Sequence, residues 1–335
     1  MKLWGDPAGR PRAATQAFRK CQSATGGPPG EPGIYFKEMI QTKEIGPVKI
    51  FFGKHPSYPY CNTLLVKGRQ TLLVDPACDE KALRTLAGGE RIDYLFNTHY
   101  HPDHIRYNSL FDGVEFWTHR DDAPCFRSLD SMAEWVGVKD TPYEKNWKTT
   151  LTREFGFRER KEVKEVEDGR VLDLGGLLLE FLHLPGHTPG LTGFLVREFG
   201  ILFLADMELS PFGPWYHNQK ASIQGVIDSV EKIRKIHADY YIPSHGREIS
   251  RRAIGPRLDR YLENIASRER KILEALSPPK TLEELTSLSL ISGFRLSPGQ
   301  VWFLFERNMV EKHLIRLLEQ RKISKGRDRF QRETH

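Results

Sequence analysis

The stretch NTHYHPDH, residues 97–104, places three histidines and an aspartate in the pattern HxHxDH. It follows the short apolar run 94–96, which predicts a β-strand. The polar side chains therefore lie on a loop at the carboxyl end of a strand. Pro102 favours the non-helical backbone that such closely spaced side chains need if they are to face one point.

Coordination chemistry explains why these residue types occur together. Zinc binds imidazole nitrogen and carboxylate oxygen, and a catalytic zinc site keeps one position open for water. His99 and His101 can face one metal ion, whereas Asp103 and His104 lie just beyond them and can turn towards a second. No GxSxG elbow, P-loop or dinucleotide fingerprint occurs in the sequence to indicate another chemistry.

In three later segments, an apolar run is followed by a residue that can bind a metal. Each of these residues is flanked by Gly, Pro or small residues, as in a tight turn. A shared sheet edge would bring them together with the HxHxDH loop. They are His187 after a predicted strand at 177–184, Asp206 after one at 201–204, and His245 after one at 239–242.

The rest of the middle of the chain has the pattern of an α/β domain. One helix is predicted over 223–233, where apolar residues recur at helical spacing. The polar segment 121–164 predicts loops and short helices near a binding face. Further strands are predicted at 48–52, 63–66, 71–74, 114–117 and 193–196, of which the second and third form a hairpin.

The order and spacing of these motifs resemble the metallo-β-lactamase superfamily over roughly residues 34–252. The resemblance implies an α/β fold, the four-layer αβ/βα sandwich, with two metal ions at one edge. The implied ligands are His99, His101 and His187 for the first ion, Asp103, His104 and His245 for the second, and Asp206 as a bridge, with Asp75 supporting the site by hydrogen bonding.

The resemblance also implies that a hydroxide between the two ions attacks the substrate, because two cations lower the pKa of bound water towards neutrality. Asp103 or Asp206 would be the catalytic carboxylate that orients this water. The ligands suit two zinc ions, but relatives use iron or manganese with similar ligands, so the metal stays open. His101 stands where the diiron flavoprotein branch has Glu, which favours zinc hydrolysis over redox chemistry.

Three further residues are candidates for substrate binding. Arg106 follows the HxHxDH motif, where many relatives carry Gly-Gly, and would either contact an anionic substrate or pack on the surface. Trp215 and Tyr216 follow the Asp206 loop and would either line the substrate pocket or pack in the core.

The two ends of the chain differ in composition from the middle. We therefore expect the catalytic domain to span residues 34–255. The Gly- and Pro-rich residues 1–33 predict a flexible N-terminal arm. Residues 256–335 predict a small helical, basic, winged-helix-like domain. Its expected elements are helices at 264–276 and 309–318, a capping box starting at Thr281, and a hairpin at 323–330 turning near Gly326.

Charge and cysteine content bear on partners and compartment. The C-terminal quarter carries the surplus of Lys and Arg that gives the net charge of +6, so it either binds nucleic acid or is simply solvated. Four cysteines without a CxxC pair indicate free thiols. The sequence shows neither a secretory signal nor a membrane-spanning apolar run, so we expect a cytoplasmic protein without membrane contacts. An oligomer stays open.

Within the superfamily, the layout resembles the glyoxalase II and β-lactamase-like hydrolase branch with a winged-helix-like tail. We therefore expect hydrolysis of a small-molecule ester or thioester. One alternative is an endoribonuclease or other phosphodiesterase acting on nucleic acid through the basic tail. Another is a regulatory or binding protein whose metal site is vestigial. The fold by itself does not choose among these functions.

Overall fold

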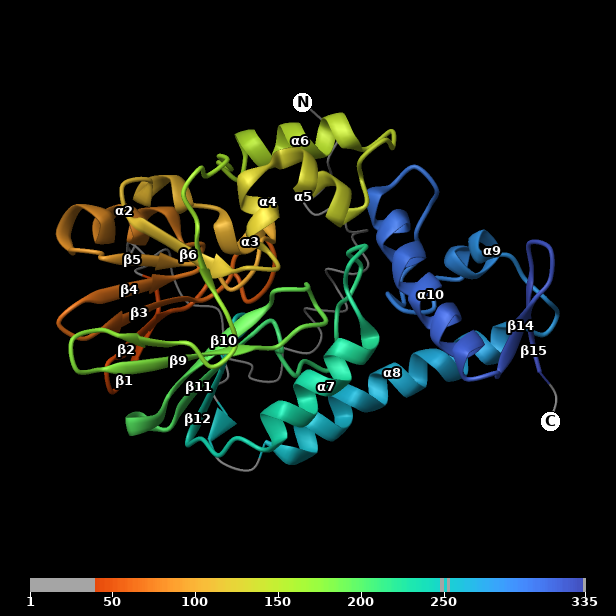
Figure 1. The fold of residues 1–335 in the computed structure, drawn as a ribbon. Coiled ribbons are helices and arrows are strands. Elements are labelled where there is room, and N and C mark those ends of the chain that lie inside the picture. Colours follow the sequence, from red (N-terminus) through yellow and green to blue (C-terminus); the bar gives the residue numbers. More distant parts are fainter. Residues whose placement is uncertain (1–39, 248–249, 252–253, 334–335) are drawn as a thin grey trace, which may run out of the picture. The chain divides into compact units, whose positions relative to one another are not determined.

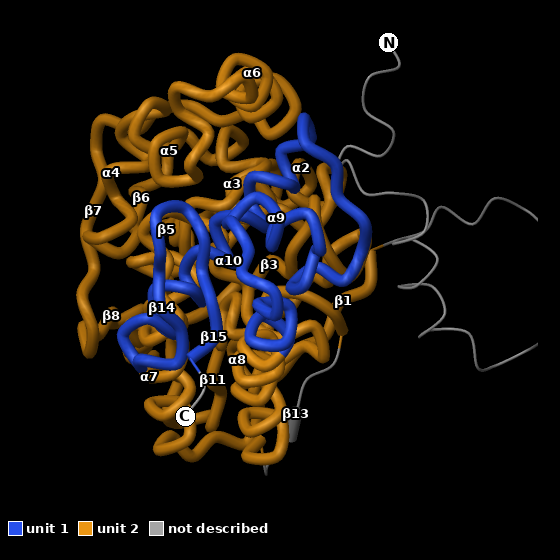
Figure 2. The backbone as a smooth tube through the Cα atoms, turned by 90° about the vertical axis from the view of Figure 1, so that its right-hand side faces the viewer, with its two compact units in different colours: residues 1–39, 271–335 blue, residues 40–270 orange. Residues whose placement is uncertain are grey.

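The computed structural model describes residues 40–247, 250–251 and 254–333 of the 335-residue chain. The predicted arm at 1–33 lies outside the described residues. The described residues divide into two compact units, one formed by Ile40–Arg270 and the other by the residues from Lys271 onward (Figure 2). The division falls inside a long helix, and the domain boundaries expected from the sequence stay predictions.

The first sheet of the larger unit has seven strands in sequence order. The first four pair antiparallel and the last four pair parallel, with the fourth strand common to both sets. The strands are β1 (Thr42–Ile45), β2 (Val48–Phe51), β3 (Thr63–Lys67), β4 (Thr71–Val74), β5 (Tyr94–Phe96), β6 (Glu115–His119) and β7 (Lys164–Val166).

The second sheet has six strands, all antiparallel except for the pair β11 and β12. β10 and β11 are buried along their whole length, as expected of strands covered on both faces. In spatial order the strands are β13 (Ser250–Arg251), β12 (Tyr240–Pro243), β11 (Ile201–Ala205), β10 (Thr192–Val196), β9 (Leu178–His183) and β8 (Val171–Asp173).

The two sheets face each other, and helices cover their outer sides (Figure 1). Phe96 of β5 meets Phe181 of β9 with ring centroids 4.8 Å apart, so the inner faces share one apolar core. The expected αβ/βα sandwich is confirmed. The helices between the strands of the first sheet are α2 (Glu80–Gly89), α3 (Pro102–Ile105), α4 (Ala123–Arg127), α5 (Leu129–Val136) and α6 (Glu144–Arg153). In the second sheet α7 (Ile223–Arg234) lies between β11 and β12, and α8 (Gly255–Ala275) follows β13. Two 3-10 turns are η1 (Asn108–Phe111) and η2 (Arg197–Phe199).

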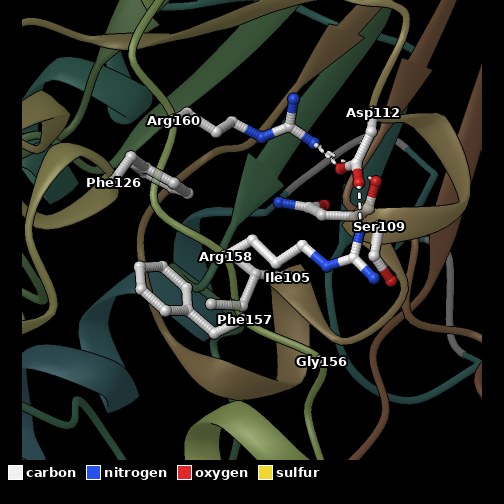
Figure 3. Close-up of a pocket in the computed structure, with 9 residues that line it drawn as sticks. Ile105, Ser109, Asp112, Phe126, Gly156, Phe157, Arg158 and Arg160 are labelled. Atoms are coloured by element: carbon white, nitrogen blue, oxygen red, sulfur yellow. Dashed lines mark hydrogen bonds and ion pairs between the residues drawn. The ribbon is translucent and has the colours of Figure 1, made fainter.

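The predicted strands, the hairpin and the helix over 223–233 are all present. The segment 121–164 holds short helices, α4 to α6, as expected. The residues after α6 are fastened to η1 around a small hollow shown in Figure 3. There Asp112 accepts hydrogen bonds from Arg158 at 2.7 Å and from Arg160 at 3.5 Å.

The described part of the smaller unit contains two helices and a hairpin, α9 (Leu282–Ser287), α10 (Val301–Glu319), β14 (Ile323–Lys325) and β15 (Phe330–Arg332). The predicted capping box is present, because Thr281 caps α9 and Glu284 bonds back to the Thr281 amide. β14 and β15 pair antiparallel, which confirms the predicted hairpin. No helix among the described residues is both long and apolar enough to cross a membrane.

The close approach of β10 to β11 depends on Gly193. A Cβ atom there would lie 2.1 Å from the backbone oxygen of Phe203, three residues before Asp206. We expect Gly193→Ala to lower the free energy of unfolding by about 1–3 kcal/mol, because the strands must separate. Urea unfolding measures this change. Gly113→Ala is the matched control, since its Cβ would meet nothing; equal stabilities of the two variants would contradict the prediction.

Candidate metal centre

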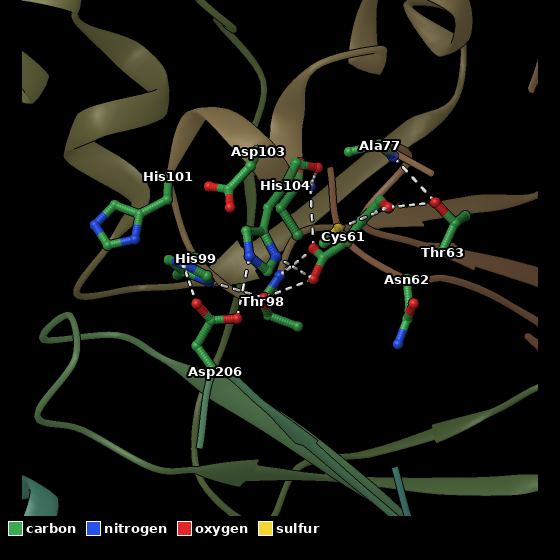
Figure 4. Close-up of polar contacts among 12 residues, drawn as sticks. Cys61, Asn62, Thr63, Ala77, Thr98, His99, His101, Asp103, His104 and Asp206 are labelled. Atoms are coloured by element: carbon green, nitrogen blue, oxygen red, sulfur yellow. Dashed lines mark hydrogen bonds and ion pairs between the residues drawn. The ribbon is translucent and has the colours of Figure 1, made fainter. Parts of the chain in front are cut away.

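Four strand ends bring the predicted ligands to one edge of the sandwich, and a fifth brings Asp75. Figure 4 shows His99, His101, Asp103, His104 and Asp206 together at this edge. His99 and His101 lie in the loop after β5, whereas Asp103 and His104 lie in α3, which begins at Pro102. The expected non-helical backbone across the motif was therefore wrong, because proline is favourable in the first turn of a helix. The residues after β4, β9, β11 and β12 carry Asp75, His187, Asp206 and His245. The pairs β4–β5 and β11–β12 are each parallel, so their carboxyl ends lie at the same edge. This topology explains how residues far apart in the sequence come together.

Four ligand atoms form the first half-site: His99 Nε2, His101 Nδ1, His187 Nε2 and Asp206 Oδ2. His187 Nε2 lies 2.8 Å from His101 Nδ1, 3.2 Å from His99 Nε2 and 3.3 Å from Asp206 Oδ2. Ligand bonds of 2.0–2.1 Å in a tetrahedron give ligand–ligand separations of roughly 3.3 Å. The four side chains are therefore spaced as a zinc-sized ion requires.

The second half-site uses the other oxygen of the same carboxylate. Asp206 Oδ1 lies 3.1 Å from His104 Nε2 and 3.7 Å from His245 Nε2. His245 Nε2 also lies 3.4 Å from Asp103 Oδ2. The geometry thus groups His99, His101 and His187 on one side of Asp206, and Asp103, His104 and His245 on the other.

Hydrogen bonds on the far side of three imidazoles direct their lone pairs into the centre. His104 Nδ1 donates to Asp75 Oδ2 at 2.8 Å, and His187 Nδ1 donates to the Trp215 carbonyl at 2.7 Å. His99 Nδ1 bonds Thr98 Oγ1, which in turn donates to Asp75. Since one ring nitrogen of a neutral imidazole is an acceptor, each Nε2 is left with its lone pair facing the other ligands.

The converging ligand atoms of the centre fit a bound cation. His104 Nε2 and Asp206 Oδ1 are both buried, and neither makes a hydrogen bond to any described residue despite lying 3.1 Å apart. Buried polar atoms without a partner are costly. Converging lone pairs repel one another, and a divalent ion between them removes both penalties.

Two buried residues that we did not single out in the sequence hold the ligand loops. Asp122, after β6, accepts from Thr188 Oγ1 and the Gly190 amide, both at 2.7 Å, and so clamps the loop of His187. Asn62 donates to the carbonyls of Pro243 and Gly246, on either side of His245. Asp122 comes shortly after a strand, as the ligands do, so the sequence contained a signal for its role. The sequence contained no such signal for Asn62, because its hydrogen-bond partners lie far away along the chain.

The backbone is strained where Asp206 enters the centre. Ala205 has a φ of 48°, a left-handed conformation that residues with a side chain seldom adopt. The register between β11 and β12 also shifts between Phe203 and Ala205. Such irregularities turn a side chain at the end of a strand, and here they accompany the carboxylate shared by the half-sites.

The three substrate-binding candidates lie in different surroundings. Arg106 is partly exposed, and its guanidinium group lies 4.7 Å from the Phe155 ring centroid and 5.3 Å from that of Tyr60. Trp215 is partly exposed, and its carbonyl holds His187. Tyr216 is fully buried and its hydroxyl accepts from Arg268, which favours packing over pocket lining for this residue.

The two half-sites differ in how their histidines bind protons. Burial lowers the pKa of His99 and His101 well below the ordinary value and also lowers that of His187. Burial opposes charge on His245 too, but Asp206 and Glu208 outweigh it and raise the pKa of His245 to about 9. For Asp206, burial raises the pKa, but His104 and His245 hold it well below the ordinary value.

These shifts predict that metal uptake releases protons at the second half-site only. At neutral pH His245, with its raised pKa, carries a proton that a metal must displace, whereas the first three histidines are already neutral. Affinity at the second half-site should therefore fall as pH drops below about 9, and at the first only in more acidic solution. Calorimetry of metal-free protein in buffers of different ionisation enthalpy counts the protons. Equal proton release at both half-sites would contradict this assignment.

Comparisons with known proteins agree with this geometry. The family model described as Metallo-beta-lactamase superfamily matches residues 59–245, more than half of the chain. The hydroxyacylglutathione hydrolase GloC of Haemophilus influenzae is 29% identical over 158 residues, 44% of this chain and 65% of that protein. The mitochondrial persulfide dioxygenase ETHE1 of Bos taurus is 25% identical over 228 residues, 64% of this chain and 75% of that protein.

Solved structures show the same fold. A metallo-beta-lactamase family protein of Thermus thermophilus matches with a TM-score of 0.68 and 22% identity, covering 86% of this chain and 99% of that one. A beta-lactamase domain protein from Burkholderia ambifaria matches with a TM-score of 0.66 and 16% identity, covering 89% and 96%. With its sandwich fold, its cluster of His and Asp and its family match, the chain belongs to the metallo-β-lactamase superfamily.

Proposed function

We propose that the protein is a hydrolase of small-molecule esters or thioesters that works with two divalent metal ions. One observation carries the proposal: the Asp206 carboxylate turns one oxygen to His99 and His187 and the other to His104 and His245. A single carboxylate between two groups of imidazoles is the arrangement that a two-metal site needs. Zinc suits the imidazole-rich donor set, with iron and manganese as the alternatives.

The metal ions, when bound, would lower the pKa of water and polarise the substrate carbonyl. His99, His101 and His187 would hold one ion, and Asp103, His104 and His245 the other. Asp103 and Asp206 are the carboxylates at the centre, so they are the groups placed to orient the attacking water by accepting its hydrogen bond. Asp75 would position the His104 imidazole and Asp122 the loop of His187, since both carboxylates are fully buried behind the ligands.

The choice of a thioester or ester is supported by the relative named as a hydroxyacylglutathione hydrolase, with which this chain shares 29% identity. Arg106 adds a preference for substrates that carry an anionic group. Three aromatic rings surround its guanidinium group, only its Nε is engaged, by Tyr107 at 3.2 Å, and no carboxylate among the described residues pairs with it. An arginine held in this way presents free N–H donors to a carboxylate or phosphate.

A phosphodiesterase acting on RNA is the second candidate. The hairpin of β14 and β15 exposes Lys325 and Arg327 in the basic C-terminal part of the chain. Nucleic-acid binding by such residues falls steeply as salt rises. Salt dependence therefore separates this function from thioester hydrolysis, which should respond little to salt.

The central experiment combines metal analysis of the full-length protein with a panel of thioester, ester, lactone, β-lactam, phosphodiester and RNA substrates. We expect close to two metal ions per chain and hydrolysis of a thioester or ester. His101→Ala should lose first-site metal and lower kcat/KM by more than about a hundredfold, since it removes a direct ligand. His237→Ala, at an exposed histidine, is the control.

Two results would overturn the proposal. Less than one ion per chain, with activity unchanged in His101→Ala, would indicate a vestigial metal site. Metal-dependent cleavage of RNA alone, weakened by salt, would establish the second candidate instead.

Arg106→Gln tests the preference for an anionic substrate. For a thioester with a carboxylate we expect KM to rise about tenfold, the value of one charge-assisted hydrogen bond, with kcat nearly unchanged. An uncharged analogue of the same thioester should show no change. Arg153→Gln, at an exposed arginine, is the matched control. Equal effects of Arg106→Gln on both substrates would rule out recognition of the anion.

A further inference from the structure

Glu208 brings a third carboxylate to the second half-site. It lies two residues after Asp206, and its Oε1 is 3.9 Å from His245 Nε2. Among the described residues, ligand atoms of Asp206, Glu208 and His245 all lie within 4.8 Å of one another. Leu209, the next residue, has a φ of 53°, so the chain turns sharply just after Glu208.

Within the described part of the chain, no other ion pair engages the Glu208 carboxylate. Its side chain is 30% exposed, and its contact with His245 is the one ion pair that the described residues provide. Asp206 Oδ1 and His104 Nε2, on the same side of the centre, are buried without a hydrogen-bond partner among the described residues. The ligand atoms fall into two groups that share His245, one with Asp103 and His104 and the other with Asp206 and Glu208. Carboxylates gathered on one side of the centre in this way favour a divalent cation among them.

We propose that Glu208 is an additional ligand of the second half-site, beside Asp103, His104, Asp206 and His245. This inference rests on the two-metal centre of the proposed function, but not on the identity of the substrate. Glu208 gives the second half-site three oxygen and two nitrogen donors, against one oxygen and three nitrogen donors in the first.

The two half-sites therefore prefer different ions. Four donors, three of them imidazole nitrogens, suit tetrahedral zinc. Five donors, three of them carboxylate oxygens, suit a harder ion that accepts more ligands, such as Mn²⁺ or Fe²⁺. The added negative charge also strengthens the attraction for any divalent cation. Glu208 thus raises the affinity of the second half-site for manganese or iron and makes this half-site less specific for zinc than the first.

The test measures metal binding directly, on full-length protein freed of metal with a chelator. Calorimetric titration with Mn²⁺ and with Zn²⁺ gives the affinity of each half-site. In Glu208→Gln, which keeps the size of the side chain, we expect second-site affinity for Mn²⁺ to fall at least about tenfold while first-site affinity for Zn²⁺ stays unchanged. Glu162→Gln, at an exposed glutamate, is the control.

Glu208→Asp, which keeps the charge but shortens the side chain, should recover part of the affinity, and Glu208→Ala should match Glu208→Gln. Circular dichroism of the metal-free variants checks that each one is folded. Second-site affinity for Mn²⁺ within twofold of the wild type in Glu208→Gln and Glu208→Ala would overturn the inference. If wild-type protein binds one ion only, the two-metal centre fails and this inference with it. If it binds two ions but hydrolyses no ester or thioester, only the substrate class of the proposed function fails.

Discussion

The carboxylate of Asp206 is the point on which the rest of the centre depends. Its two oxygens face two different groups of imidazoles, so neither half-site is complete without it. The residue must lie at the end of a buried central strand and turn away from the strand direction. β11 is buried at every position, and the left-handed backbone of Ala205 supplies the turn. Strain at this position is sustained because the packed strands on either side leave no other path.

The sandwich serves mainly to hold lone pairs towards one another. Imidazole nitrogens as close as 2.8 Å, facing a carboxylate, would separate in a flexible loop. Here Asp75 fixes His104 directly and His99 through Thr98, while Asp122 and Asn62 fasten the loops of His187 and His245. The packing of the two sheets offsets the repulsion between the converging lone pairs, and a bound cation would remove this repulsion. Ligand geometry set in advance in this way is what a catalytic metal site requires.

The two sides of the centre are chemically unequal. Burial keeps His99 and His101 on the first side neutral, whereas Asp206 and Glu208 keep His245 on the second side charged until a metal displaces its proton. Glu208 extends this asymmetry, because it adds charge to one side only. Arg106, in its aromatic surroundings beside the HxHxDH loop, adds a positive group that faces no carboxylate among the described residues. This is the group that we propose to bind the anionic part of a substrate.

The sequence by itself determined the strands and the identity of the residues at the edge, because apolar runs ending on His or Asp are local patterns. The sandwich followed from the resemblance of these motifs to the superfamily. The sequence also determined the capping box at Thr281 and the hairpin of β14 and β15. Only the tertiary structure decided which oxygen of Asp206 faces which imidazole, and it also revealed Asp122, Asn62 and Glu208. Their roles depend on partners that lie far away in the sequence or across the centre. Local pattern carries no information about such contacts, because the packing of the two sheets creates them.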